Sequence, residues 1–360
     1  MKKALIASTA LVLTAGVAAA DVTISGFGRT GVQYYEDGIL TGFDPILGID
    51  GNDTQVISRL RMNIDAATST DQGVDFGARF RIQWDQNSTS RGNQGELNAG
   101  KLYVTSSGLT VEVGNVAGAI DTSRLIYASE LGAFDRSVGG NALGSYFAYV
   151  TGPYEDKDRM GVFVTYTLDT LKVSASYIDP DQTGFREDRI VFDPDANDGE
   201  GGFVTQNVKE EFSFVIDYTW QERLELSAGL AINGAGIEDH DVYFLGARYA
   251  VMENARIGLN YYDNGDAGSI AGVSGNPTRP NLIDDFGNTI TLYGDYTLAD
   301  GLTNIEAYIA NNDGDWTQKE TDNSFGIGVN YDLGGARLGA SIQRDYQERV
   351  TADMGVRFDF

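Results

Sequence analysis

The chain of 360 residues contains no cysteine and a single histidine, His240. The lack of cysteine excludes a disulfide framework, a thiol nucleophile and thiolate metal sites. Nucleophilic catalysis needs a reactive group beside an oriented base, and one histidine in a polar stretch offers no such set. We therefore expect no catalytic residues and no enzymatic activity.

Basic residues and long apolar runs are also scarce. The 26 lysines and arginines face 52 aspartates and glutamates, which gives a net charge of −26. This charge disfavours nucleic-acid binding, because such binding needs a basic face. After residue 20, no apolar run approaches the ~18 residues of a membrane-spanning helix. The 6 prolines and 45 glycines suit a chain of strands and turns.

Residues 1–20 have the composition of a secretory signal peptide. Lys2 and Lys3 come first, an apolar stretch follows over residues 4–17, and three alanines stand at 18–20. This is the order of a positive start, an apolar region and a small-residue cleavage site. We expect cleavage before Asp21, which leaves residues 21–360 as one domain.

What the sequence does contain is strict alternation of apolar and polar residues. In the last ten residues, the even positions from Ala352 to Phe360 are apolar, and all odd positions are polar or glycine. A period of two indicates a strand whose two faces meet different environments. The polar faces carry Arg, Asp, Glu and Asn, so a soluble sandwich with an apolar interior is excluded. Comparable runs occupy residues 54–66, 74–85, 211–220, 224–232 and 325–333.

The connections between these runs alternate between short and long. Seven short and eight long connections predict an all-β fold with 16 antiparallel strands. Short turns at one end and long loops at the other are typical of bacterial outer-membrane barrels, which have lipid outside and a polar interior. A barrel of this size is wide enough for an aqueous channel. The sequence therefore predicts a transmembrane β-barrel with both termini at the short-turn end.

The strongest local signal is a repeated Arg-x-Arg motif. Arg59 and Arg61 lie on one predicted strand, and Arg79 and Arg81 lie on the next. A turn centred near Thr70 would place Arg59 opposite Arg81 and Arg61 opposite Arg79. Directly opposed like charges destabilise a strand pair, so such a cluster suggests a functional basic wall at a pore constriction. Two further inward positions would extend this wall: Arg29 and Lys101.

The longest connection, residues 115–158, is the expected counterpart of this wall. Structureless loops of more than ~15 residues are uncommon and usually functional. This third loop carries Asp121, Glu130 and Asp135 among bulky apolar residues, which a fully solvent-exposed loop would not need. We expect the loop to fold into the lumen and to place its acids opposite the arginines, where rows of charge set ion selectivity.

The chain resembles the Gram-negative general diffusion porins, most closely those of the alphaproteobacterial type. Four features carry the resemblance over essentially the whole mature chain: the start Asp21-Val-Thr-Ile-Ser-Gly-Phe-Gly-Arg29, the Arg-x-Arg pair, the loop after Val111-Glu-Val-Gly-Asn115, and the end Val356-Arg-Phe-Asp-Phe360. The Pro-Glu-Phe-Gly-Gly turn of enteric porins is absent, which leaves open which loop acid lies at the narrowest point.

The resemblance implies a location in the outer membrane of a Gram-negative bacterium and passive diffusion of ions and small hydrophilic solutes. It also implies a homotrimer in contact with outer-membrane lipid and lipopolysaccharide. In this family the assembly machinery reads the last strand, here the one that contains Phe358 and Phe360.

Two points stay open at this stage. The basic band is also compatible with a substrate-selective channel for phosphate or another anion, whereas a sugar channel would need an aromatic track in the lumen, for which Phe27, Tyr103 and Phe163 are candidates. No cofactor is expected, but the acidic external loops could hold Ca²⁺. No stretch has the spacing of an EF-hand, so the sequence leaves the metal unknown.

Overall fold

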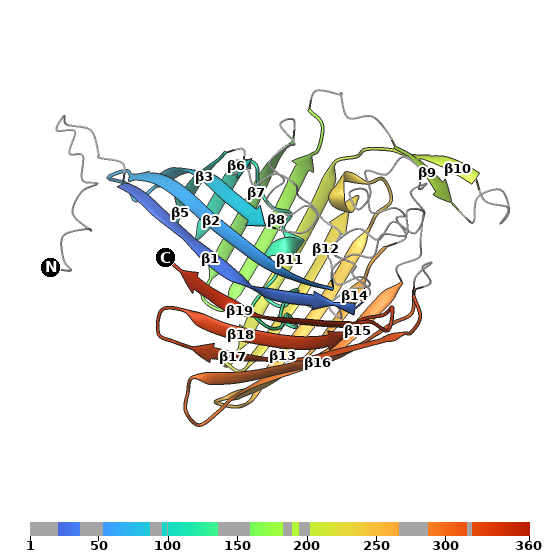
Figure 1. Ribbon diagram of the computed structural model, residues 1–360. Helices are drawn as coiled ribbons and strands as arrows, with labels where there is room; N and C mark the ends of the chain where they lie inside the picture. The colour runs from blue at the N-terminus through green and yellow to red at the C-terminus, as the bar shows by residue number, and fades with distance from the viewer. Residues whose placement is uncertain are drawn as a thin grey trace.

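The computed structural model describes residues 21–36, 53–86, 96–98, 100–135, 159–182, 189–193, 202–265, 287–314 and 319–360 (Figure 1). The expected signal peptide lies outside these residues, as does most of the acidic loop sequence considered for Ca²⁺. No helix in the described part of the chain is long and apolar enough to span a membrane. The two short 3-10 turns there are η2 (Ile120–Thr122) and η3 (Gly234–Gly236).

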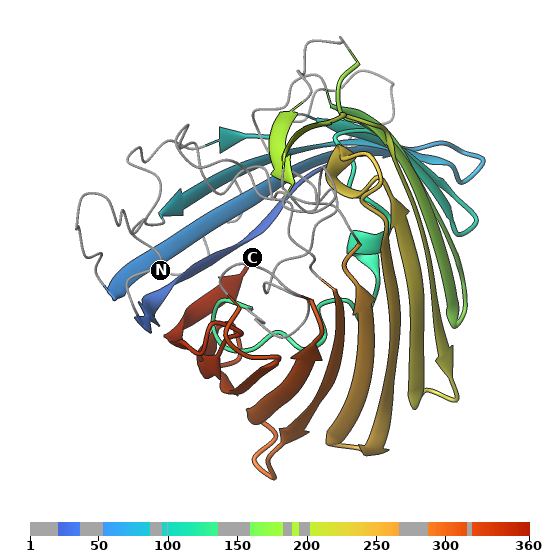
Figure 2. The same ribbon diagram turned by 90° about the vertical axis from the view of Figure 1, so that its right-hand side faces the viewer.

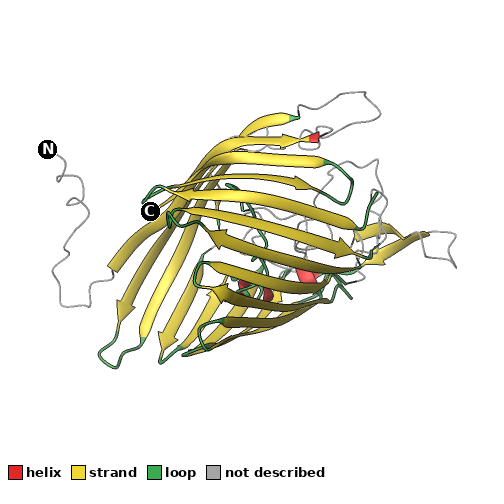
Figure 3. Ribbon diagram, turned by 90° about the horizontal axis from the view of Figure 1, so that it is seen from below, coloured by secondary structure: helices red, strands yellow, loops and turns green. Residues whose placement is uncertain are grey.

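Strands make up most of the described residues, as Figure 3 shows. Their bounds in chain order are β1 (Asp21–Tyr35), β2 (Thr54–Ser69), β3 (Asp75–Gln86), β4 (Glu96–Leu97), β5 (Lys101–Ser106), β6 (Leu109–Gly114), β7 (Met160–Leu168), β8 (Leu171–Asp179), β9 (Arg189–Asp193), β10 (Gly202–Gln206), β11 (Glu211–Trp220), β12 (Leu224–Ile232), β13 (Val242–Met252), β14 (Ala255–Asp263), β15 (Asn288–Thr297), β16 (Thr303–Asn312), β17 (Asn323–Asp332), β18 (Arg337–Arg344) and β19 (Val350–Asp359).

The sheet closes on itself because β1 pairs antiparallel with both β2 and β19. The interrupted strands β4 and β5 both pair with β3, and the hairpin of β9 and β10 forms a separate sheet. The described strands therefore fill 16 places around the barrel, as the sequence predicts. Figure 2 shows the ring, and Figure 1 shows β9 and β10 projecting beyond it.

The first and last strands meet in a seam that explains the glycines near the N-terminus. Gly28 lies opposite Phe358, and a Cβ at Gly28 would come within 2.5 Å of the Phe358 ring. The missing side chain thus makes room for the aromatic ring. At the edge of the seam, the backbone N–H of Phe360 donates to the carbonyl of Gly26 at 3.0 Å. The side chains of Phe358 and Phe360 stay 45% and 49% exposed on the outer surface.

The two faces of the wall reverse the usual rule for soluble proteins. On β11, Phe212, Phe214 and Ile216 point outward and are exposed, whereas Ser213 and Asp217 point inward and are buried. Outward apolar and inward polar residues suit a wall with lipid outside and water inside. The same alternation continues on the neighbouring strands, so the predicted faces are confirmed.

Residues 115–135, the described part of the third loop, lie against the inner face of this wall. Tyr262 on β14 donates its hydroxyl to the carbonyl of Ile126 at 2.7 Å, and the Asn260 amide donates to the carbonyl of Leu125 at 2.8 Å. Figure 2 shows η2 on the inner side of the ring. The apolar loop residues Ile120, Leu125 and Ile126 pack on a patch of inward apolar side chains: Val215, Ala231, Val242, Phe244 and Tyr262.

A second set of hydrogen bonds ties the loop to the wall further along. The backbone N–H of Ala119 reaches the hydroxyls of Ser176 and Ser213, at 2.8 and 2.5 Å. The N–H of Ala133 reaches the Asp353 carboxylate at 3.0 Å. The loop thus runs along the inside from β8 to β19, and inward side chains of the wall satisfy part of its backbone.

The one histidine has a structural environment. His240 follows η3 and is 2% exposed; its ring nitrogens lie 2.9 Å from the carbonyl of Gly234 and 3.1 Å from that of Asn264. Burial lowers the pKa of His240, which favours the neutral ring, and the single N–H of a neutral imidazole can donate to one of these two carbonyls.

Candidate functional site

Four arginines stand side by side on four neighbouring strands. Arg29 on β1 lies opposite Arg59 on β2 and, on its other side, opposite Arg357 on β19. Arg357 in turn lies opposite Arg337 on β18. We call Arg337, Arg357, Arg29 and Arg59 the arginine row. All four are in register across these strands and occupy inward-facing positions.

Such a row would be unstable without compensation, because opposed like charges repel. Asp135 of the third loop supplies this compensating negative charge. Its carboxylate lies 2.5 Å from an Nη atom of Arg337 and 2.5 Å from one of Arg357, and 4.0 Å from Nη1 of Arg29. Arg29 also donates to the carbonyl of Phe134 at 2.9 Å. One loop acid therefore joins three strands at the point where the barrel closes.

Aromatic rings provide further partners for these guanidinium groups. The Phe27 ring centroid lies 4.4 Å from Cζ of Arg357 and 5.3 Å from that of Arg61. Arg29 lies 5.3 Å from the Phe134 centroid. Cation–π contacts within about 6 Å are attractive, so Phe27 serves the basic wall rather than a sugar track.

The pairing of the two Arg-x-Arg segments differs from the prediction. The structure pairs Arg59 with Asp85 and Arg79 with Asp65, so the proposed opposition of arginines was wrong. The turn is centred at Gln72, with the N–H of Thr70 bonded to the carbonyl of Val74 at 2.9 Å, and Gly73 takes a φ of +76°. A shift of the turn centre by two residues shifts the pairing by four.

This register gives each arginine of β2 and β3 a polar partner directly across the strand pair. Nε of Arg79 donates to Asp65 at 2.7 Å, and Nε of Arg59 donates to Asp85. Arg61 and Arg81 are matched in the same way with neutral acceptors, Gln83 at 2.5 Å and Asn63 at 3.0 Å. Favourable cross-strand pairs thus replace the repulsion that the sequence interpretation assumed.

The remaining predicted site residues take different positions. Lys101 lies next to Arg79 in the sheet but forms an ion pair with Glu112 on β6 at 2.5 Å. Asp121 accepts a hydrogen bond from the hydroxyl of Tyr127. Burial raises the pKa of Asp121, and the nearby charges of Arg81 and Arg159 oppose this shift.

Glu130 lies deeper in the loop. Burial raises its pKa well above the usual value, the charge of Asp135 adds to this shift, and Arg29 and Arg357 oppose it. Of the three loop acids, Asp135 is thus the one in direct contact with the arginine row. Asp121 and Glu130 influence the basic wall over longer range.

Two hollows adjoin the row inside the barrel. One, of about 340 Å³, is lined by Arg29, Arg59, Asp85 and Asp135 together with glutamines of β1 and β2. The other, of about 570 Å³, lies toward the short turns and is lined by Arg337, Glu306 and other polar residues of β14 to β19. Charges of both signs line both spaces, an arrangement that can attract hydrated ions without holding one tightly. No cluster of potential metal ligands occurs among the described residues.

The sequence profile of the Gram-negative porins matches residues 7–349. The chain belongs to this family. It is 34% identical to a porin of Fuscovulum blasticum over 345 residues, a match that covers 94% of this chain and all of the relative. The fold is similar to that of a triple mutant of the Rhodopseudomonas blastica porin, with a TM-score of 0.73 and 32% identity over 94% of this chain and all of that one. A second mutant of the same porin gives a TM-score of 0.74 over the same shares, also at 32% identity.

Family, fold and site together define what the protein is. It is an outer-membrane porin whose barrel forms a channel for passive diffusion, and it is not an enzyme. The substrate-selective alternative is not favoured. Sequence reasoning missed Arg337 and Arg357, although the connection centred at Gln347 already pairs these two positions. It also missed the wall residues that hold the third loop.

Proposed function

We propose that the narrowest part of this porin's channel is the gap that the third loop leaves beside the arginine row. One observation carries the proposal: Asp135, a loop residue, contacts arginines of β1, β18 and β19. A loop segment that lies along the inner wall from β8 to β19 occupies part of the lumen and must reduce the open cross-section. Permeation is then limited by this gap and is open to any hydrophilic solute small enough to pass.

In this proposal, the charges at the gap tune ion preference. The basic wall consists of Arg29, Arg59, Arg61, Arg79, Arg81 and Lys101, to which we add Arg337 and Arg357. The loop acids are Asp121, Glu130 and Asp135. The net charge of −26 draws cations to the channel mouths, within a Debye length of about 10 Å at 0.1 M salt. Because the basic wall opposes this attraction, we expect weak cation selectivity.

Four further features belong to the proposal. Residues 1–20 serve as the signal peptide, the barrels assemble as the homotrimer typical of porins, and Phe358 and Phe360 form the signal for the assembly machinery. Lipopolysaccharide and Ca²⁺ are proposed to meet the acidic external loops, where a divalent cation would bridge carboxylates to anionic lipid.

The test is the zero-current potential across planar bilayers in a KCl gradient. Replacing Arg59, Arg61, Arg79 and Arg81 together by serine removes four positive charges and leaves Asp65 and Asp85 without their partners. Cation preference and single-channel conductance should both increase. Arg344→Ser, which breaks an ion pair with Glu348 in an external loop, is the control and should change little. Equal effects of the two variants would contradict the proposed constriction.

A further inference from the structure

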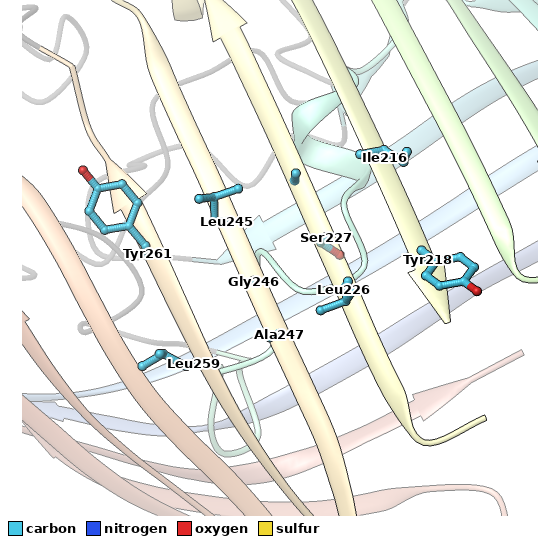
Figure 4. Close-up of a pocket in the computed structure, with 10 residues that line it drawn as sticks. Ile216, Tyr218, Leu226, Ser227, Leu245, Gly246, Ala247, Leu259 and Tyr261 are labelled. Atoms are coloured by element: carbon cyan, nitrogen blue, oxygen red, sulfur yellow. The ribbon is translucent and has the colours of Figure 1, made fainter. Parts of the chain in front are cut away.

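The outer wall of the barrel carries a hollow of about 500 Å³ across β11 to β14. Figure 4 shows its larger side chains, which come from all four strands. The lining is almost wholly apolar and lies on the opposite face from the lumen, and none of the described third-loop residues, 115–135, is part of it. It is lined by Ile216, Tyr218, Leu226, Ala228, Leu245, Ala247, Leu259 and Tyr261, with the backbone of Ser227 and Gly246 between them.

Two alanines make this hollow. Ala228 on β12 lies between Ile216 and Leu245, and Ala247 on β13 lies between Leu226 and Leu259. Each alanine is thus flanked on both sides by a large side chain that stands up from the wall. The two low positions are diagonal neighbours on adjacent strands, so together they form a trough that runs obliquely across β12 and β13.

A polar and aromatic cluster lies below the trough, at the short-turn end of the same strands. Trp220, Leu224 and Tyr249 stand at one level, and the Arg223 guanidinium lies 5.2 Å from the centroid of the Tyr249 ring. The contact with Tyr249 keeps this cation on the outer side of the rim. Tyr249 is two residues from Ala247, about 7 Å along the strand.

The Arg223 guanidinium is held in place but does not use all its hydrogen-bond donors in the bond that positions it. One of its Nη atoms donates to the carbonyl of Ala250 at 2.9 Å. A guanidinium carries five N–H donors, so donors remain for an oxyanion. Tryptophan and tyrosine beside a cation are typical of the level where lipid headgroups begin.

We propose that this surface binds one glycerophospholipid, with an acyl chain in the trough and the phosphate at Arg223. The headgroup is zwitterionic with an amine, because Glu222 adjoins Arg223 in the same exposed turn and makes the turn neutral. In outer-membrane barrels the short turns face the periplasm, so the lipid belongs to the inner leaflet. An acyl chain is the proposed occupant of the trough because it is the elongated apolar group that a bilayer offers to an apolar hollow.

The experiment measures lipid retained by the porin after reconstitution. Nanodiscs contain phosphatidylethanolamine and phosphatidylglycerol in equal amounts, the protein is extracted in mild detergent, and native mass spectrometry counts the bound lipid. Wild-type porin should keep phosphatidylethanolamine. The double variant Ala228→Leu/Ala247→Leu fills the trough, and each added side chain displaces about two methylene groups, so retention should fall about tenfold or more.

Two further variants complete the test. Ala175→Leu, on the outer face of β8, makes the same change outside the trough and should retain lipid like wild type. Arg223→Gln keeps the trough but removes the cation and should also lose lipid. Conductance should be unchanged in all variants, since none alters the lumen.

Three results would overturn the inference. The filled variant could retain as much phosphatidylethanolamine as wild type. The wild type could keep phosphatidylglycerol in preference, which would exclude the zwitterionic headgroup. Alternatively, the filled variant could lose its oligomeric state on unheated gels while Ala175→Leu keeps it, which would mean that a neighbouring chain covers the trough.

Discussion

Replacing Asp135 by asparagine isolates the contribution of the loop acid to ion preference. The carboxylate is 27% exposed and lies 2.5 Å from guanidinium nitrogens of Arg337 and Arg357. Asparagine keeps the size and one acceptor but removes the charge, so the arginine row loses its main compensation. A unit charge acts on an ion about 8 Å away in water with roughly 0.5 kcal/mol, of which about half remains at 0.1 M salt.

Removing that charge favours anions and disfavours cations, so the permeability ratio should shift toward anions about twofold. The assay is the zero-current potential of single porin channels in a KCl gradient. Glu253→Gln removes the same charge from an exposed turn at the rim and serves as the control. If Asp135→Asn moves the potential no further than Glu253→Gln does, Asp135 does not border the ion path and the proposed constriction is wrong.

Three other changes test separate parts of the account. Leu226→Arg puts a charge on the lipid face and should destabilise the barrel by about 2–4 kcal/mol near the midplane; urea unfolding in vesicles measures this, and stability equal to that of Leu226→Met would contradict the assignment of faces. Raising the pH ionises Glu130, whose pKa burial raises, so cation preference should increase with pH in wild type; a Glu130→Gln channel with the same pH slope would rule this out. The pair Asn260→Ala/Tyr262→Phe removes two anchors of the third loop and should change single-channel conductance, whereas unchanged conductance would show that these bonds do not hold the loop in its place inside the lumen.

The strands and their order can be predicted from the sequence because the two faces of each strand meet different environments. Lipid on one side and water on the other impose alternation, as in the run from Phe212 to Trp220. The alternation of seven short and eight long connections then gives the number of strands. Alternation shows that Ser227 faces inward, but not that the third loop covers it and leaves it 4% exposed.

The details of the site depend on contacts that alternation does not specify. The β2–β3 pairing depends on a turn whose centre cannot be located by inspection, since Thr70 and Gln72 both lie in a polar stretch. The opposition of Arg29 and Arg357 depends on closure of the barrel between the two ends of the chain. The bonds from Asp135 require the third loop to reach β18 and β19, more than 200 residues away.

The most direct test uses the absence of native cysteine. Arg59→Cys and Leu60→Cys place single thiols at neighbouring positions, one facing the proposed constriction and the other facing lipid with 39% of its surface exposed. A bulky, water-soluble methanethiosulfonate reagent is added during single-channel recording. The account predicts a stepwise fall in conductance for Arg59→Cys alone, with the zero-current potential shifting according to the sign of the reagent's charge. Equal block of both variants, or block of neither, would contradict a water-filled channel narrowed at the arginine row.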